Sequence, residues 1–235
     1  MDQFKYRIGE KNILVYRSVY APVKSNMFIL LTGKEAIVLD PNVDEELLQL
    51  FKKYSIKKVS IFLTHGHYDH ISGVEWLKEH TGASVFCQSK CADRLANSKR
   101  PLARLVALVL AEEDKKDGGH RFLEFKESYR PFTISADKIF EKQEKVRIGD
   151  LVFDITSTPG HTEGSACYKL FDTIVFTGDS FLEDNSNVTR FPGGNQQDYE
   201  QITLRYIRNL SPDTIIMPGH GDPFVLKDVI YKCVI

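Results

Sequence analysis

The sequence predicts an α/β domain made of two βα halves whose sheets pack face to face, with helices on the outside. Short segments rich in Val, Ile, Phe and Tyr alternate with helical segments, in the order strands, helix, strand, helix and then strands, helix, strand. A length of 235 residues fits one large domain. The sequence shows neither a linker nor a tandem repeat, so we expect a single domain over residues 1–235.

The first half of the chain opens with strand-like segments. Strands are expected over residues 13–20, 26–33 and 35–40. Residues 41–55 are predicted to form a helix capped by Asn42 or Asp44, because acidic residues follow the cap and lysines lie near the end. This half continues with a buried strand over 57–65, a helix over 71–80 that stops at Gly82, and a strand over 83–88.

Residues 89–130 depart from this alternation. Residues 102–116 have a helical pattern that is strongly apolar over 105–110, and Asp117-Gly118-Gly119 then breaks the helix. We interpret the segment as a helical insertion. It either packs against the rest of the domain or forms a lid or dimer surface near the functional site, because long insertions in compact domains are often functional.

Strand patterns return in the second half. Residues 146–160 and 165–179 carry strands, with a hairpin turn at Phe171-Asp172. A helix over 198–210 then leads into a strand over 213–221.

The charge balance excludes some functional classes. With 31 Lys and Arg against 32 Asp and Glu, the formal net charge is −1 when the seven His are counted as neutral. A nucleic-acid-binding domain is normally basic, so we expect no nucleic-acid partner. We also expect no membrane partner, because no apolar run approaches the ~18–20 residues of a membrane span. Four scattered cysteines and an N-terminus without a signal-peptide pattern favour a cytoplasmic location.

Chemically active side chains concentrate in the sequence THGHYDH at residues 64–70, between an apolar strand and a helix. Alternate residues of an extended loop point the same way, so His65 and His67 can hold one ion, whereas Asp69 and His70 can serve a second. Imidazole and carboxylate together are the usual ligands of zinc and also suit iron or manganese. We therefore expect a metal site here.

Three further candidate ligands also follow apolar strands. They are His161 in STPGHT, Asp179 in FTGDS and His220 in MPGHG. The glycine that precedes each of these residues permits a tight turn and a close approach of the backbone to an ion.

Together, the sequences HGHYDH, PGHT, GDS and PGHG resemble the motifs of the metallo-β-lactamase superfamily, in its glyoxalase II-like branch, over about residues 10–222. This resemblance implies a four-layer αββα sandwich with the site at one edge of the two sheets. It implies that His65, His67 and His161 hold one metal, that Asp69, His70 and His220 hold another, and that Asp179 bridges both. Asp69 and Asp179 are the expected catalytic residues, and Asp40 is expected to support the ligand loop rather than bind an ion.

The resemblance and the chemistry predict a metal-dependent hydrolase. Two divalent ions, zinc or alternatively iron or manganese, would share a water and lower its pKa towards ~7, and the bridging hydroxide would attack a carbonyl. We expect the substrate to be a thioester of the hydroxyacylglutathione kind, or a related small ester or lactone. The alternative is a persulfide dioxygenase-like oxidoreductase with one non-haem iron. That enzyme would not need His220, so the presence of His220 favours the hydrolase.

The remaining expectations concern the other histidines and the partners. We place His80 at a helix C-terminus and His120 in the insertion, both outside the metal site. Two divalent ions would make the cleft positive, so we expect a small anionic substrate, which Arg190 or basic residues of the insertion could contact. Few residues follow His220, so we do not expect the C-terminal helical extension with which glyoxalase II contacts glutathione. The protein is expected to be a monomer or a homodimer.

Overall fold

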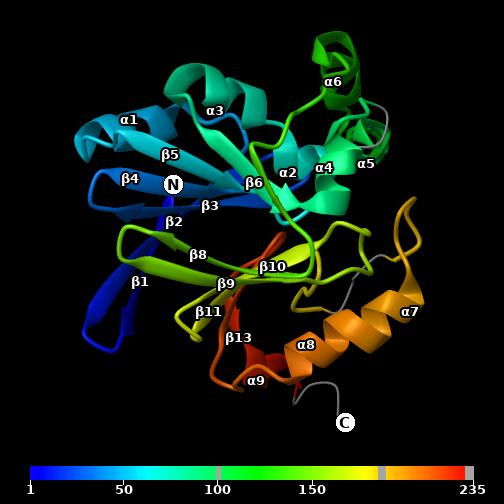
Figure 1. Ribbon diagram of the computed structural model, residues 1–235. Helices are drawn as coiled ribbons and strands as arrows, with labels where there is room; N and C mark the ends of the chain where they lie inside the picture. The colour runs from blue at the N-terminus through cyan, green and yellow to red at the C-terminus, as the bar shows by residue number, and fades with distance from the viewer. Residues whose placement is uncertain (99–101, 185–188, 231–235) are drawn as a thin grey trace.

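The computed structural model describes residues 1–98, 102–184 and 189–230. Two β-sheets pack face to face, and helices cover the outer face of each (Figure 1). The chain enters the second sheet only after completing the first, so each half of the sequence builds one sheet with its helices. The expected four-layer αββα sandwich is confirmed.

The N-terminal sheet has the strand order β1-β2-β3-β4-β5-β6-β7. Its strands are β1 (Asp2–Ile8), β2 (Lys11–Tyr20), β3 (Ser25–Thr32), β4 (Glu35–Leu39), β5 (Lys58–Phe62), β6 (Ser84–Gln88) and β7 (Lys138–Phe140). Strands β1 to β4 pair antiparallel, whereas β4 to β7 pair in parallel. Since parallel strands end at the same edge of a sheet, β4 and β5 deliver the residues that follow them to one place.

The helices of the first half are α1 (Glu45–Lys53), α2 (Tyr68–Ile71), α3 (Val74–Thr81) and α4 (Ser89–Leu95). Asp44 caps α1 by accepting a 2.9 Å hydrogen bond from the Glu46 amide, as the sequence predicts. The predicted stop at Gly82 is also confirmed, because Gly82 ends α3 with φ 66°. The helix expected over 71–80 is in fact divided into α2 and α3.

The C-terminal sheet has the strand order β13-β12-β11-β10-β9-β8. Its strands are β8 (Gln143–Ile148), β9 (Leu151–Ser157), β10 (Ala166–Leu170), β11 (Ile174–Gly178), β12 (Ile215–Pro218) and β13 (Phe224–Val225). The hairpin turn predicted at Phe171-Asp172 joins β10 to β11. The outer helical segments are α7 (Gln196–Asp198), the π-helical turn η1 (Tyr199–Thr203), α8 (Leu204–Arg208) and α9 (Leu226–Ile230).

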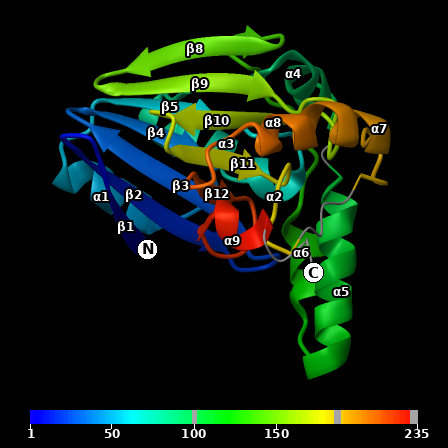
Figure 2. The same ribbon diagram turned by 90° about the horizontal axis from the view of Figure 1, so that it is seen from below.

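The segment expected to be a helical insertion contains α5 (Ala103–Asp117) and α6 (Arg121–Ser128) in addition to α4. Gly118, with φ 75°, ends α5 at the predicted break. Figure 2 shows α5 and α6 lying side by side at the edge of the molecule, and α5 contacts α2, which begins within the sequence 64–70.

The core between the sheets is largely aromatic. Phe62 of β5 stacks on Tyr168 of β10 with ring centroids 5.1 Å apart, and it meets Phe153 of β9 edge-on at 5.4 Å. The Tyr168 hydroxyl donates a 2.7 Å hydrogen bond to the Leu63 carbonyl oxygen, at the end of β5. This bond ties the two sheets together immediately before the THGHYDH sequence.

Among the helices that the structure describes, none is long and apolar enough to cross a membrane.

We expect Tyr168→Phe to lower the free energy of unfolding by about 1–3 kcal/mol, because the buried Leu63 carbonyl would lose its hydroxyl donor. Urea unfolding measures this change. Tyr206→Phe is the matched control, because the buried Tyr206 hydroxyl makes no hydrogen bond and its removal should leave stability unchanged or raise it. Equal losses in the two variants would contradict the assigned role of the Tyr168 hydroxyl.

Candidate metal centre

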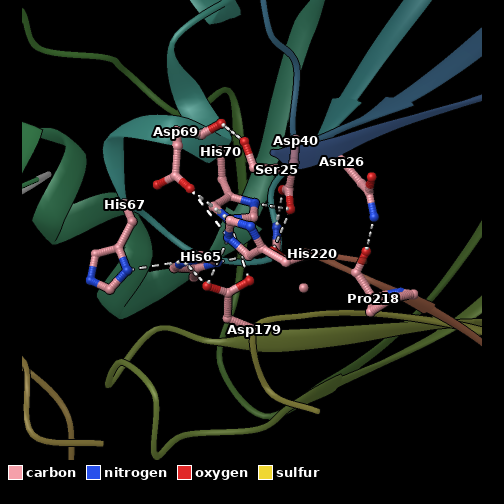
Figure 3. Close-up of polar contacts among 12 residues, drawn as sticks. Ser25, Asn26, Asp40, His65, His67, Asp69, His70, Asp179, Pro218 and His220 are labelled. Atoms are coloured by element: carbon pink, nitrogen blue, oxygen red, sulfur yellow. Dashed lines mark hydrogen bonds and ion pairs between the residues drawn. The ribbon is translucent and has the colours of Figure 1, made fainter. Parts of the chain in front are cut away.

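The candidate site lies where strands of both sheets end. His65, His67, Asp69 and His70 follow β5, His161 follows β9, Asp179 directly follows β11, and His220 follows β12. The structure brings all seven predicted ligands into one cluster, in which Asp69 and Asp179 approach His70 and His220 from opposite sides (Figure 3). Both halves of the chain therefore contribute to the site.

Three imidazoles form the first group, which we call the triple-histidine set: His65, His67 and His161. Their candidate ligand atoms lie within 4.8 Å of one another. The Nδ1 atom of His67 is 3.1 Å from His65 Nε2 and 2.9 Å from His161 Nε2. All three side chains are buried, so their ring nitrogens converge away from bulk water.

Asp69, His70 and His220 form the second group, which we call the mixed set. The Asp69 Oδ2 atom lies 3.4 Å from the Nε2 atoms of both His70 and His220. His70 is fully buried, whereas Asp69 and His220 are partly exposed. The mixed set is thus the more open of the two groups.

The Asp179 carboxylate lies against both sets. Its Oδ2 atom is 3.5 Å from His161 Nε2 and 3.6 Å from His220 Nε2, and its Oδ1 atom is 3.4 Å from His70 Nε2. The neighbouring Gly219 must be glycine for this packing, because a Cβ atom there would lie 2.1 Å from Asp179 Oδ1. One carboxylate is therefore within reach of ions held by either set.

Asp40 and Thr64 orient two of the imidazoles. Asp40 accepts hydrogen bonds from the Thr64 amide at 2.7 Å and the Thr64 hydroxyl at 2.5 Å, and its Oδ2 atom is 2.9 Å from His70 Nδ1. Because the Thr64 hydroxyl donates to Asp40, it can only accept a hydrogen bond from the Nδ1–H group of His65, 3.1 Å away. His65 then presents an unprotonated Nε2 to the cluster, and the contact of His70 Nδ1 with Asp40 turns the Nε2 of His70 towards the cluster as well.

Three positioning residues were not anticipated from sequence. They are Thr64, Ser25 and Asn26. Ser25 donates a 3.0 Å hydrogen bond to the Asp69 carbonyl, and the Asn26 amide nitrogen donates to the carbonyls of Pro218 and Gly221, on either side of His220 (Figure 3). In the sequence, Ser25 and Asn26 are simply two polar residues at the start of an apolar strand. Their burial, which would have marked them, is known only from the structure.

The protein's own charges divide the histidines into two kinds. Burial holds the pKa of His65 and of His67 well below the usual value, so both are neutral at pH 7. Burial opposes charge at His70 and His220 as well, but the carboxylates of Asp69 and Asp179 outweigh it, raising the pKa of His70 well above its usual value and that of His220 to about 10. These imidazoles in turn hold the pKa of both aspartates well below the ordinary range, against the effect of burial.

The residues present fit a divalent cation. The buried Nε2 atom of His70 makes no hydrogen bond and lies 3.4 Å from a carboxylate oxygen on each side. An ion between this imidazole nitrogen and the carboxylate oxygens would use the nitrogen as a ligand, in place of the two ion pairs. The two sets could therefore each hold a metal ion.

The other basic side chains singled out in the sequence lie outside this cluster. His80 is at the end of α3, with Nδ1 2.7 Å from the Trp76 carbonyl oxygen, and His120 precedes α6 in the insertion. Arg190 is exposed and belongs to neither ligand set.

Sequence comparisons match most of the chain to metal-dependent enzymes. The profile of the metallo-beta-lactamase superfamily matches residues 20–220. The chain is 24% identical over 207 residues to the probable metallo-hydrolase YqgX of Bacillus subtilis (strain 168), with 87% of this chain and 89% of that protein covered. It is 28% identical over 194 residues to the hydroxyacylglutathione hydrolase GloC of Haemophilus influenzae, with 80% and 81% covered.

Solved structures show the same fold. The crystal structure of the BLEG-1 B3 metallo-beta-lactamase is similar with a TM-score of 0.69 and 25% identity, covering 91% of this chain and 94% of that one. The crystal structure of ETHE1 from Myxococcus xanthus is similar with a TM-score of 0.65 and 22% identity, covering 91% and 80%.

We expect Thr64→Val to lower the metal affinity of the triple-histidine set by about 10–100-fold, because His65 would lose the hydroxyl that fixes its Nδ1 proton. Titration against a competing chelator measures this affinity. Thr64→Ser keeps the hydroxyl and should bind metal as the wild type does. Unchanged affinity in Thr64→Val would show that the hydroxyl does not orient His65.

Proposed function

The chain belongs to the metallo-beta-lactamase superfamily, and we propose that it is a hydrolase that cleaves a thioester, of the hydroxyacylglutathione kind, or a related small ester or lactone. One observation carries the proposal: the Asp179 carboxylate lies against both the triple-histidine set and the mixed set. The similarity to a relative named as a hydroxyacylglutathione hydrolase supports the thioester as the substrate.

We propose that the protein works with two divalent ions, most simply zinc, one held by each set and both contacted by Asp179. His220 supports two ions over one, since its Nε2 atom lies within 3.4 Å of Asp69 and 3.6 Å of Asp179 rather than apart from the cluster. When bound, such ions supply Lewis-acid polarisation of a carbonyl and lower the pKa of a water molecule towards ~7.

The chain's own residues prepare the site for this reaction. Asp69 and Asp179 are ionised at neutral pH because their pKa values lie well below the ordinary range. Either carboxylate can accept a hydrogen bond from the attacking water and so orient it towards the carbonyl carbon. Ser25 and Asp40 keep the supporting loop in place through the Asp69 carbonyl and the His70 imidazole.

We further propose a small, partly anionic substrate. A groove of about 690 Å³ beside the site is lined by two guanidinium groups, those of Arg94 and Arg104 of the helical segment, together with Tyr129 and, among the residues described, a single carboxylate, that of Glu163. Guanidinium groups recognise carboxylates well, so the groove suits an anionic part of the substrate that lies beyond the scissile bond.

The zinc-loaded protein is expected to hydrolyse at least one member of a panel of thioesters, small esters and lactones, measured by release of the thiol or the acid. His220→Ala should lower kcat/KM at least about a hundredfold, the scale on which loss of one electrostatic group in a site slows turnover. His80→Ala is the matched control and should retain full activity, because His80 lies at the end of α3.

Two outcomes would contradict the proposal. One is a panel left wholly unhydrolysed by zinc-, iron- and manganese-loaded protein. The other is a single iron per chain in protein from unsupplemented cells together with oxygen consumption on glutathione persulfide, which would identify an oxidoreductase.

Metal binding to the two sets should depend differently on pH. His65 and His67 are neutral at pH 7, whereas an ion at the mixed set must displace protons from His70 and His220, whose pKa values are raised. Affinity at the mixed set should therefore rise with pH between about 6 and 8, about tenfold per unit for each proton displaced, while affinity at the triple-histidine set should rise less, because no proton leaves His65 or His67. Calorimetry in two buffers of different protonation enthalpy measures the protons released. Parallel pH dependence at both sets would contradict the assignment.

A further inference from the structure

A small cavity opens directly onto the candidate metal centre. It has a volume of about 210 Å³, and one side of it consists of candidate ligands from both sets, namely His67, Asp69, His161, Asp179 and His220. This volume is below the ~300–1,000 Å³ of a site for a drug-sized ligand, so the cavity fits one end of a substrate rather than a whole one.

The rest of the wall of this cavity is apolar. Its residues are Val23, Leu102, Leu105, Val106, Val109 and Phe191. Four of the six come from α5 and the residue before it, at spacings of three and four, so a single face of this helix builds most of the wall. Among the described lining residues, only the candidate ligands have polar side chains.

The wall is built by the segment whose role the sequence left open between a packed insertion and a lid. Val106 is buried, whereas Val109 lines the cavity although it is 46% exposed. Leu108, 61% exposed, belongs to the solvent-facing side of the same helix and is absent from the cavity wall. The apolar residues of α5 therefore line the cavity at the site as well as packing against the rest of the domain.

We infer that the far end of the substrate's acyl group, remote from the scissile carbonyl, is a short hydrocarbon chain that α5 recognises, in preference to a chain that carries a hydroxyl at that end. This inference rests on the proposed hydrolase function and narrows it. A hydrocarbon chain gains free energy by leaving water for the wall of Leu102, Leu105, Val106 and Val109, whereas a hydroxyl there would lose its water partners and find no replacement on α5.

The position of Leu102 indicates how the bound substrate is oriented. Leu102 lines both this cavity and the larger groove that contains Arg94 and Arg104. The acyl chain then occupies the apolar cavity, and the polar leaving group extends past Leu102 into the groove. The anionic character expected of the substrate thus belongs to the leaving group.

Thioesters of one thiol with different acyl groups test the inference. From acetyl to butanoyl, kcat/KM should rise about threefold to fourfold per methylene, the ratio for ~0.8 kcal/mol per buried CH₂. Propanoyl and 3-hydroxypropanoyl thioesters differ by a single hydroxyl at the far end of the chain, and the propanoyl compound should be the better substrate.

Two matched variants locate the recognition on α5. Leu105→Asn puts an amide into the apolar wall and should abolish both preferences, whereas Leu108→Asn makes the same change on the exposed side and should keep them. Leu105→Met keeps an apolar side chain of similar size and should also keep them, which separates lost recognition from lost folding. Calorimetry of product binding gives a readout without turnover: butanoate should bind more tightly than 4-hydroxybutanoate, whose hydroxyl is at the far end of the chain, except in Leu105→Asn.

The outcomes separate this inference from the function on which it rests. Turnover of all acyl groups without a hydrocarbon preference, or a preference for the 3-hydroxypropanoyl thioester, would overturn the inference and leave the hydrolase standing. A preference that Leu105→Asn does not change would overturn the assignment to α5. Failure to hydrolyse any thioester, ester or lactone would overturn the proposed function and the inference with it.

Discussion

Charge compensation in a buried cluster is the constraint on which the rest of this structure depends. Five imidazoles and two carboxylates share one site at the edge of the sheets, and a third carboxylate, that of the buried Asp40, lies behind them. No such set is stable unless each charge meets an opposite charge or a metal ion. The bonds that fix Asp40, Thr64 and Asn26 in place are therefore costly to disturb, since moving any of them uncovers charge. The sandwich supplies the rigidity that holds these groups so close.

Much of the fold and the ligand positions could be predicted because their signals are local. Apolar runs identify β2 to β6 and β9 to β12, and the short sequences around His65, His161, Asp179 and His220 mark the strand ends. Of β8, only the last residues lie in the segment 146–160 that was expected to carry strands. The edge strands β1, β7 and β13 were not predicted, because β1 has no fully buried residue and β7 and β13 have only three and two residues. Thr64, Ser25 and Asn26 escaped detection for another reason: their partners are distant in sequence, and no local pattern shows where a hydroxyl or amide will find an acceptor.

The helical segment shows how one sequence pattern can serve two purposes. The apolar run in α5 indicates a helix but not its partner, because a core face and a ligand-binding face look alike in sequence. In the structure the same face meets both the domain and the cavity, and Tyr68, inside the ligand sequence, packs edge-on against Phe125 of α6 and against Tyr129 at 5.4 Å each. Substrate contact and support of the ligand loop are thus combined in one insertion, so changes in α5 and α6 can alter specificity without touching a ligand.

Each ligand set draws side chains from both halves of the chain. His65 and His67 follow a strand of the N-terminal sheet, and His161 follows one of the C-terminal sheet; Asp69 and His70 likewise face His220. An ion bound at either set would link the two sheets and stabilise the folded state. It would add to the aromatic contacts that fill the interface between the sheets. The supply of metal would then set the rate at which proteases degrade the protein in the cell. A cell short of metal would lose the protein itself as well as its activity.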